Sequence, residues 1–218
     1  MRRRGAFALL LVAGLWISSR PSEAQPAADF DFYVLALSWS PTFCALTGNQ
    51  RGDAQCASSP PRAFVLHGLW PQYERGYPRS CGGASAPRIP DGTIARMLDI
   101  MPSRGLVIHE WRTHGTCSGL DPQSYFDTAR RAFSQITIPE ALRTPRAAGS
   151  ASPSDIEQAF LKANPALSHE GIAVTCAKGQ LEEVRICLSR TLQPRRCAEV
   201  NRKACRAGVI DIPGATAR

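Results

Sequence analysis

The chain has 218 residues, the size of one domain of moderate length or of two small ones. Hydrophobic residues make up 44% and charged residues 20%, which excludes a disordered chain, a coiled coil and a collagen-like fibre. Lysine and arginine number 26 against 18 aspartates and glutamates, and the resulting charge of +8 indicates an anionic partner such as nucleic acid or a membrane surface, with plain basic solubility as the alternative.

The first 24 residues are predicted to be a signal peptide and not part of the fold. Arginines at positions 2–4 precede an apolar run over residues 6–17, which has the length of a signal-peptide core and is too short to span a membrane. Small residues precede a cleavage site after Ala24. An uncleaved anchor is the alternative, and the short run argues against it. Residues 25–218 would then form a periplasmic or extracellular protein without a membrane span.

Eight cysteines lie downstream of this segment: Cys44, Cys56, Cys81, Cys117, Cys176, Cys187, Cys197 and Cys205. An even number of cysteines behind a signal peptide is typical of disulfides formed in an oxidising compartment. A structural zinc site is the other common use of cysteine, but the chain contains no C-x-x-C pair. Spacing alone does not choose among the possible pairings.

Two strands are predicted near the start of the mature chain. Residues 32–39 are β-prone and mostly apolar, which is typical of a buried strand, and Pro41 ends this run. Residues 63–67 form a second apolar run that ends at Gly68.

Helices are predicted over the middle of the chain. Residues 94–101 form a short helix that Pro102 stops, and residues 106–108 are a further short apolar run. Asp121 and Pro122 suit the N-cap and the first position of a helix, and the apolar residues that follow recur on one helical face.

A surface loop and another helix are predicted next. Residues 143–153 are rich in alanine, proline, serine and glycine, a composition typical of a loop. Ser154 and Glu157 have the spacing of a capping box at the start of a helix.

The last predicted elements form a β-hairpin. Residues 172–176 and 181–188 are its arms, around a turn at residues 178–179, and apolar side chains alternate along the second arm. Because hairpins occur and strands do not alternate regularly with helices, we expect an α+β fold. The expected architecture is one disulfide-stapled domain with a central, mainly antiparallel sheet flanked by helices.

Three of the four histidines fall in two short segments. His67 begins the sequence HGLWP, and His109 and His114 lie in the sequence HEWRTHGTC. A single histidine at a strand end or in a loop would carry no functional meaning, but three beside glycine, tryptophan and cysteine are unlike scattered surface histidines. His169 is far from both segments and is predicted to be a surface residue.

The second segment differs from the zinc-protease signature, in which two histidines four residues apart share one face of a helix. His109 and His114 are five apart, so on a regular helix they diverge by about 140°. Glu110 and His114 are four apart and would share a face, with the carboxylate supporting the imidazole. We therefore expect no metal and no other cofactor, and a zinc hydrolase using His67 with this segment is a disfavoured alternative.

Together, residues 67–71 and 109–117 resemble the two active-site segments of the ribonuclease T2 family of secreted endoribonucleases. The resemblance extends over most of residues 30–206. It implies metal-independent cleavage of single-stranded RNA by transphosphorylation through a 2′,3′-cyclic phosphate. RNA is then the expected partner, DNA is not cleaved because it lacks the 2′-OH, and we expect a monomer.

The resemblance also implies roles for individual residues. His114 would be the general base and His67 the general acid, with the reverse order as an alternative, and histidine suits both roles near neutral pH. Glu110 would stabilise the transition state and His109 would hold phosphate. Trp70 would pack on a base of the substrate, and a core tryptophan is the alternative reading.

Two positions depart from the family's pattern. Thr113 stands where members often carry a lysine that offsets the charge of the phosphorane; either Arg112, one residue earlier, reaches the phosphate instead, or this charge is absent. Gln72 stands where members often carry an aspartate that reads the base, so no base preference is transferred. Tyr73 and Tyr77 are both candidates for stacking on a base.

The resemblance further implies four disulfides: Cys44–Cys56, Cys81–Cys117, Cys176–Cys205 and Cys187–Cys197. A sequential pairing of the last four cysteines is the alternative. The competing function is a non-catalytic secreted module of the same fold that binds RNA or protein, and only the threonine at position 113 favours it.

Overall fold

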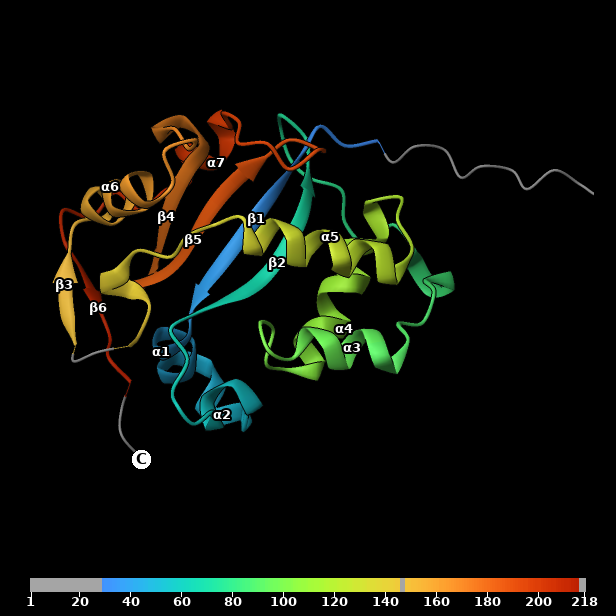
Figure 1. Cartoon of the computed structure of the whole chain (residues 1–218), viewed down its shortest axis with the longest axis horizontal. Coiled ribbons are helices and arrows are strands. Elements are labelled where there is room, and N and C mark those ends of the chain that lie inside the picture. Colours follow the sequence, from blue (N-terminus) through green and yellow to red (C-terminus); the bar gives the residue numbers. More distant parts are fainter. Residues whose placement is uncertain (1–28, 146–147, 216–218) are drawn as a thin grey trace, which may run out of the picture.

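The computed structural model describes residues 29–145 and 148–215, so the predicted signal peptide lies outside the described residues. The fold is α+β, as the sequence predicts, with helices packed against one six-stranded sheet (Figure 1). Within the described residues, no helix is long and apolar enough to cross a membrane.

The sheet brings together segments that are far apart in the sequence. Its strands are β1 (Phe32–Trp39), β2 (Phe64–Gln72), β3 (Gly149–Ala151), β4 (Ile172–Ala177), β5 (Gln180–Leu188) and β6 (Ile210–Ile212). The order is β2-β1-β5-β6-β3, and β4 also pairs with β5. Only the β5–β6 pairing is parallel among the strands described. Because β1 lies between β2 and β5, the first histidine segment is two strands away from the C-terminal hairpin.

Helices pack against the sheet, most of them on the side of the main core and the last, short one against a second, smaller cluster. They are α1 (Ser40–Phe43), α2 (Asn49–Arg51), α3 (Asp91–Met97), α4 (Arg104–Thr113), α5 (Pro122–Ser134), α6 (Pro153–Ala163) and α7 (Ala198–Arg202). In Figure 1, α3, α4 and α5 lie beside β2, and α6 and α7 lie near the β4–β5 hairpin. Leu35 and Leu66 of the sheet share one buried cluster with Trp111, Phe126 and Phe160 of the helices. This cluster anchors α4, which carries the second histidine segment.

The strand over residues 63–67 is longer than the sequence predicts. β2 continues past Gly68 to Gln72, because Gly68 and Trp70 pair with Ala36 and Val34 of β1. Pro71 lacks a backbone N–H, but β2 is an edge strand, where a missing donor is tolerated. The first motif is therefore part of the sheet and not of the loop that follows.

The capping box of α6 lies two residues earlier than predicted. The Ser152 side chain accepts the N–H of Asp155 at 3.0 Å, and the Asp155 carboxylate accepts the N–H of Ser152. Pro153 then occupies the first helical position, where its fixed φ suits a helix start. Glu157, expected in the cap, accepts a backbone N–H of β4 instead.

Two further predictions need correction. The helix predicted over residues 94–101 spans Asp91–Met97, since the carbonyl of Pro90 already accepts the first backbone N–H groups of the turn. The loop predicted over residues 143–153 contains β3, which pairs with β6, and residues 146–147 are outside the described part. By contrast, Asp121 caps α5 as expected, accepting the N–H of Ser124.

All eight cysteines are paired, and the pairing is the one that the resemblance implies. The disulfides are Cys44–Cys56, Cys81–Cys117, Cys176–Cys205 and Cys187–Cys197. The sequential alternative for the last four cysteines is wrong. Two of the bonds attach the C-terminal segment around α7 to the β4–β5 hairpin, because this segment has few apolar residues of its own with which to pack.

Candidate active site

A β-bulge in β2 determines the position of His67. The register pairs Ala36 with Gly68 and Leu37 with Leu66, so His67 has no partner on β1. A bulged residue leaves the regular alternation of the strand, and its side chain is re-aimed. The side chain of His67 is 35% exposed, although the leucine before it is fully buried.

Gly68 leaves room for a carboxylate beside β2. A Cβ atom at this position would lie 2.0 Å from Oε2 of Glu110 and 2.4 Å from Nε1 of Trp70. The absence of a side chain lets Trp70 Nε1 donate a hydrogen bond to Glu110 Oε2 at 2.7 Å. This bond joins the first motif directly to the second.

Helix α4 positions the second motif. Ser103 caps the helix, and Glu110 lies on its buried side with 1% exposure, whereas His109 beside it is exposed. The regular helix ends at Thr113, and the backbone N–H of His114 still bonds to the carbonyl of Glu110. The helix therefore presents Glu110 and His114 one turn apart, as their spacing predicts. The expected support of the His114 imidazole by this carboxylate is wrong, because Glu110 bonds to Trp70 and Nδ1 of His114 has no partner among the described residues.

Trp70 lies between the two histidines proposed for proton transfer. Its ring centroid is 5.3 Å from that of His67 and 5.2 Å from that of His114. Nε2 of His67 is 3.6 Å from Oε1 of Glu110. Thus four of the five residues predicted from the two segments, His67, Trp70, Glu110 and His114, are brought together at one place.

The site contains a second buried carboxylate, Glu183 of β5, which the sequence analysis did not single out. Nδ1 of His67 donates a hydrogen bond to Oε1 of Glu183, and Arg185 donates to Oε2 from Nε at 2.8 Å. Glu183 is 4% exposed. In the sequence, Glu183 and Arg185 alternate with the apolar Val184 and Ile186, and this local pattern carries no sign of a catalytic role. β5 has strands on both sides in the sheet, where a charged residue is unusual. The sequence does not reveal this central position, so it did not mark Glu183.

The surroundings favour opposite protonation states for the two histidines. For His67, burial lowers the pKa, but the hydrogen bond and charge of Glu183 and the charge of Glu110 outweigh this effect and raise it to about 9. For His114, burial and the charges of His109, His67 and Arg79 lower the pKa to about 4. Near neutral pH, His67 is therefore cationic and His114 is neutral.

Glu110 is held near the midpoint of its titration at neutral pH. Burial raises its pKa to about 7, although the charge of His67 and the Trp70 hydrogen bond oppose this. Its Oε1 and Nδ1 of His114 are buried and have no hydrogen-bond partner among the described residues. Buried polar atoms without a partner are uncommon, so these two mark a site whose hydrogen bonds are incomplete. Burial lowers the pKa of His109 as well.

A pocket of about 270 Å³ opens beside these residues. Its walls include Trp70, His109 and His114 from the two motifs, together with the cations Arg79, Arg185 and Lys203. A pocket lined by imidazole, indole and positive charge suits an anionic aromatic ligand such as a nucleotide.

The positions that depart from the family's pattern also lie around this pocket. Thr113 lines it and is buried, whereas Arg112 is exposed and is not among the lining residues. Gln72 lines the pocket too and donates to the carbonyl of Gly76 at 2.7 Å. Tyr77, 48% exposed, is on the pocket wall, while Tyr73 packs against the main core.

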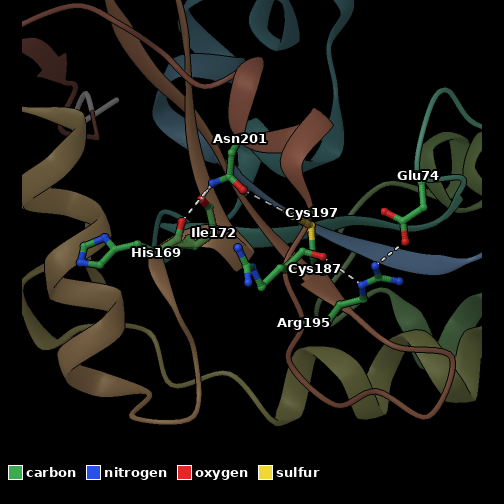
Figure 2. Close-up of a disulfide and its surroundings, with 8 residues drawn as sticks. Glu74, His169, Ile172, Cys187, Arg195, Cys197 and Asn201 are labelled. Atoms are coloured by element: carbon green, nitrogen blue, oxygen red, sulfur yellow. Dashed lines mark hydrogen bonds and ion pairs between the residues drawn. A yellow bond between two sulfur atoms is a disulfide. The ribbon is translucent and has the colours of Figure 1, made fainter.

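His169 lies away from the site, as predicted. It is exposed beside α6, and Nε2 contacts the amide nitrogen of Gln158 at 3.1 Å. Figure 2 shows its carbonyl bonded to Asn201, near the Cys187–Cys197 disulfide. In the residues that the structure describes, no three histidine, cysteine or acidic side chains are grouped to hold a metal ion.

Comparison with known proteins gives a consistent match. A sequence model of the Ribonuclease T2 family matches residues 30–197. The chain is 37% identical over 179 residues to a ribonuclease of Aeromonas hydrophila, covering 80% of this chain and 79% of the relative. Among solved structures, an RNase-related protein from Calystegia sepium matches with a TM-score of 0.68 and 22% identity, covering 86% of this chain and 98% of that one. RNase NT in complex with 5′-AMP matches with a TM-score of 0.61 and 23% identity, covering 85% and 99%.

Proposed function

This chain belongs to the ribonuclease T2 family, and from that premise we propose that it cleaves single-stranded RNA by transphosphorylation. The 2′-oxygen of a ribose attacks the adjacent phosphorus, the bond from phosphorus to the 5′-oxygen breaks, and a 2′,3′-cyclic phosphate forms. The chain is an endoribonuclease by its family and its named relatives.

The opposite protonation states of the two histidines carry the proposal. His114 is neutral and can take the proton of the 2′-OH as general base. His67 is cationic and can give its proton to the departing 5′-oxygen as general acid. The order of base and acid that the resemblance implies is therefore the one that the electrostatics favour, because the reverse order needs both histidines in their rarer protonation state.

Glu110 and His109 would act on the phosphate. Near neutral pH a large fraction of Glu110 is protonated, and the acid can donate a hydrogen bond to a phosphate oxygen as charge builds in the phosphorane. His109 lines the pocket and would hold a phosphate oxygen there. Arg79 and Lys203 add positive charge at the same wall, where the family's usual lysine is replaced by Thr113.

Trp70 would provide a stacking surface for the base. It is half-buried, packs against a small apolar cluster on its inner side and lines the pocket with the rest of the ring. Stacking of a base on an aromatic ring contributes about 1–3 kcal/mol in other proteins that bind single strands. Because stacking needs an unpaired base, the substrate is single-stranded RNA.

We further propose that the protein acts after export, as a monomer and without a metal or other cofactor. Its eight cysteines form four disulfides, which persist in an oxidising compartment such as the periplasm or the extracellular space. The predicted signal peptide over residues 1–24 and the domain over residues 25–218 agree with this compartment.

The test is cleavage of matched oligonucleotides by the purified mature protein. We expect cleavage of an RNA strand, with a 2′,3′-cyclic phosphate end detected by ³¹P NMR, both with and without EDTA. The same sequence made of DNA should remain intact, because it has no 2′-OH. Cleavage of DNA at a comparable rate, or loss of activity in EDTA, would contradict the mechanism, and binding without cleavage would indicate the non-catalytic module.

A further inference from the structure

We propose that Glu183 is a positioning residue for His67, and that Arg185 in turn holds Glu183. The pair would fix the imidazole so that Nε2, and not Nδ1, delivers the proton to the leaving oxygen. The inference deepens the proposed function and rests on it, because it takes His67 as the general acid.

The contacts of Glu183 use both of its oxygens. Oε1 accepts the Nδ1–H of His67, and Oε2 accepts from two nitrogens of Arg185, Nε at 2.8 Å and Nη2 at 2.7 Å. An ionised carboxylate only accepts hydrogen bonds, so Nδ1 must carry hydrogen in this arrangement. Nε2 is then the ring atom left for the substrate, on the side of Glu110.

The sheet explains why the carboxylate reaches the bulge. β1 lies between β2 and β5, and Glu183 is opposite Ser38 of β1 while Arg185 is opposite Ala36. Small side chains on the intervening strand leave space between the two outer strands. The bulge at His67 re-aims its ring across this space, so two strands that do not pair with each other share a hydrogen bond.

A buried carboxylate without partners would be unfavourable at this position, so Glu183 depends on His67 and Arg185. Burial raises the pKa of Glu183, but His67 and Arg185 outweigh this and lower it, so the group stays ionised. Arg185 also lies over the ring of Trp70, with Cζ 5.2 Å from the centroid, and lines the pocket. The three residues therefore link the acid to the wall that would receive the base.

The charges around His67 come from several elements. They are Glu183 and Arg185 of β5, Glu110 and His109 of α4, and His114 just after α4. Of these, only the two glutamates stabilise the imidazolium, and only Glu183 bonds to it directly. Removing the charge of Glu183 should therefore make His67 lose its proton at lower pH.

The experiment compares Glu183→Gln with Glu182→Gln, its neighbour on the same strand. The amide keeps the size of Glu183 and removes the charge. We expect the NMR titration midpoint of His67, assigned by its loss in His67→Gln, to fall by about one pH unit or more. The pH at which kcat declines on the basic side should be lower by the same amount, and KM should change little. Glu182 bonds to Thr175, and its variant should match the wild type in both measurements.

A second variant separates positioning from a general loss of structure. Arg185→Met removes a positive charge that lowers the pKa of His67, so the titration midpoint of His67 should rise. In Glu183→Gln the same midpoint should fall. Damage to the fold would not move the two variants in opposite directions. An unchanged midpoint in folded Glu183→Gln would overturn the proposal. The titration midpoint is measured without substrate, so it tests the contact between Glu183 and His67 independently of catalysis. An active His67→Ala variant would instead refute the role of His67 as general acid.

Discussion

At the scale of single residues, the proposed mechanism depends on two histidines that titrate on opposite sides of neutrality. The ionised Glu183 beside His67 and the burial of His114 produce this difference. Neither cause is a property of histidine itself, whose ordinary pKa of about 6.5 would leave both residues half-protonated near pH 6.5.

Substitution of either histidine should abolish most of the activity. We expect His67→Ala and His114→Ala each to lower kcat by about 100-fold or more, the usual size of a general acid–base contribution. His169→Ala is the control, because His169 is exposed and distant from the pocket. A His169 variant as inactive as the His114 variant would show that the site is wrongly placed.

The pH dependence of kcat should have two outer limbs, with a smaller decrease near pH 7 as Glu110 loses the proton that it would donate to the phosphate. His114 must be neutral, so activity should fall as the pH drops through its pKa of about 4. His67 must be protonated, so activity should fall as the pH rises through its pKa of about 9. Rates on a short RNA from pH 3 to 10 would measure both limbs. A narrow optimum centred on the ordinary pKa of histidine would contradict the assigned electrostatics.

Thr113→Lys tests the departure from the family's pattern. The position is on the pocket wall beside His114, so a lysine there can add positive charge next to the phosphate. We expect kcat to be maintained or raised. Arg112→Gln is the comparison, and it should have little effect because Arg112 is exposed and does not line the pocket. A large loss in Arg112→Gln would instead assign the charge to that residue.

At the scale of the elements, the bulged strand β2 and the helix α4 form the site by close approach. Gly68 is the point of contact, because Glu110 and the Trp70 indole occupy the space of its missing side chain. The carboxylate of α4 and the imidazole of β2 are held 3.6 Å apart as a result. If β2 and α4 were farther apart, Trp70 could not bond to Glu110 and the two motifs would not be in contact.

Gly68→Ala should therefore inactivate the protein. The new Cβ would lie 2.0 Å from the Glu110 carboxylate, which would have to move and break its bond to Trp70. We expect a loss of kcat of about 100-fold together with a lower melting temperature. Gly149→Ala is the matched control, since a Cβ there meets no atom within 4 Å. Full activity in Gly68→Ala would contradict the described approach of the two elements.

At the scale of the whole molecule, disulfides hold the two motifs in one frame. Cys117 follows His114 by one short turn, and Cys81 lies in the long connection after β2. Cys44–Cys56 is a bond of the α1–α2 region, which contributes no residue to the nucleotide pocket. Both disulfides close loops, but only Cys81–Cys117 includes a residue of the second histidine segment.

Removal of each bond should separate stability from activity. Cys81→Ala with Cys117→Ala, and Cys44→Ala with Cys56→Ala, should each lower the free energy of unfolding by about 2–4 kcal/mol. Only the first pair should also lower kcat at a temperature where both variants are folded. Urea denaturation and initial rates measure the two effects, and equal kcat values would show that the bond does not orient the motif.

Most elements and the class of chemistry follow from local patterns in the sequence. Alternating and helical apolar patterns predict β1, α5 and the β4–β5 hairpin, because the period of buried residues follows from local geometry. The two histidine segments predict five residues of the site, because each motif is local in the chain. The predicted boundaries at the end of β2 and at the start of α6 were wrong. Strand pairing sets the first boundary, and competition between nearby capping residues sets the second.

How those residues act together depends on contacts that form in the folded chain. The bulge at His67 depends on its register with β1, and Glu183 becomes part of the site only because β1 lies between β2 and β5. The pKa values of His67 and His114 depend on burial and on charges more than 40 residues away in the chain, such as Glu183. These quantities are set by distances in space, and a linear pattern of residues does not contain them.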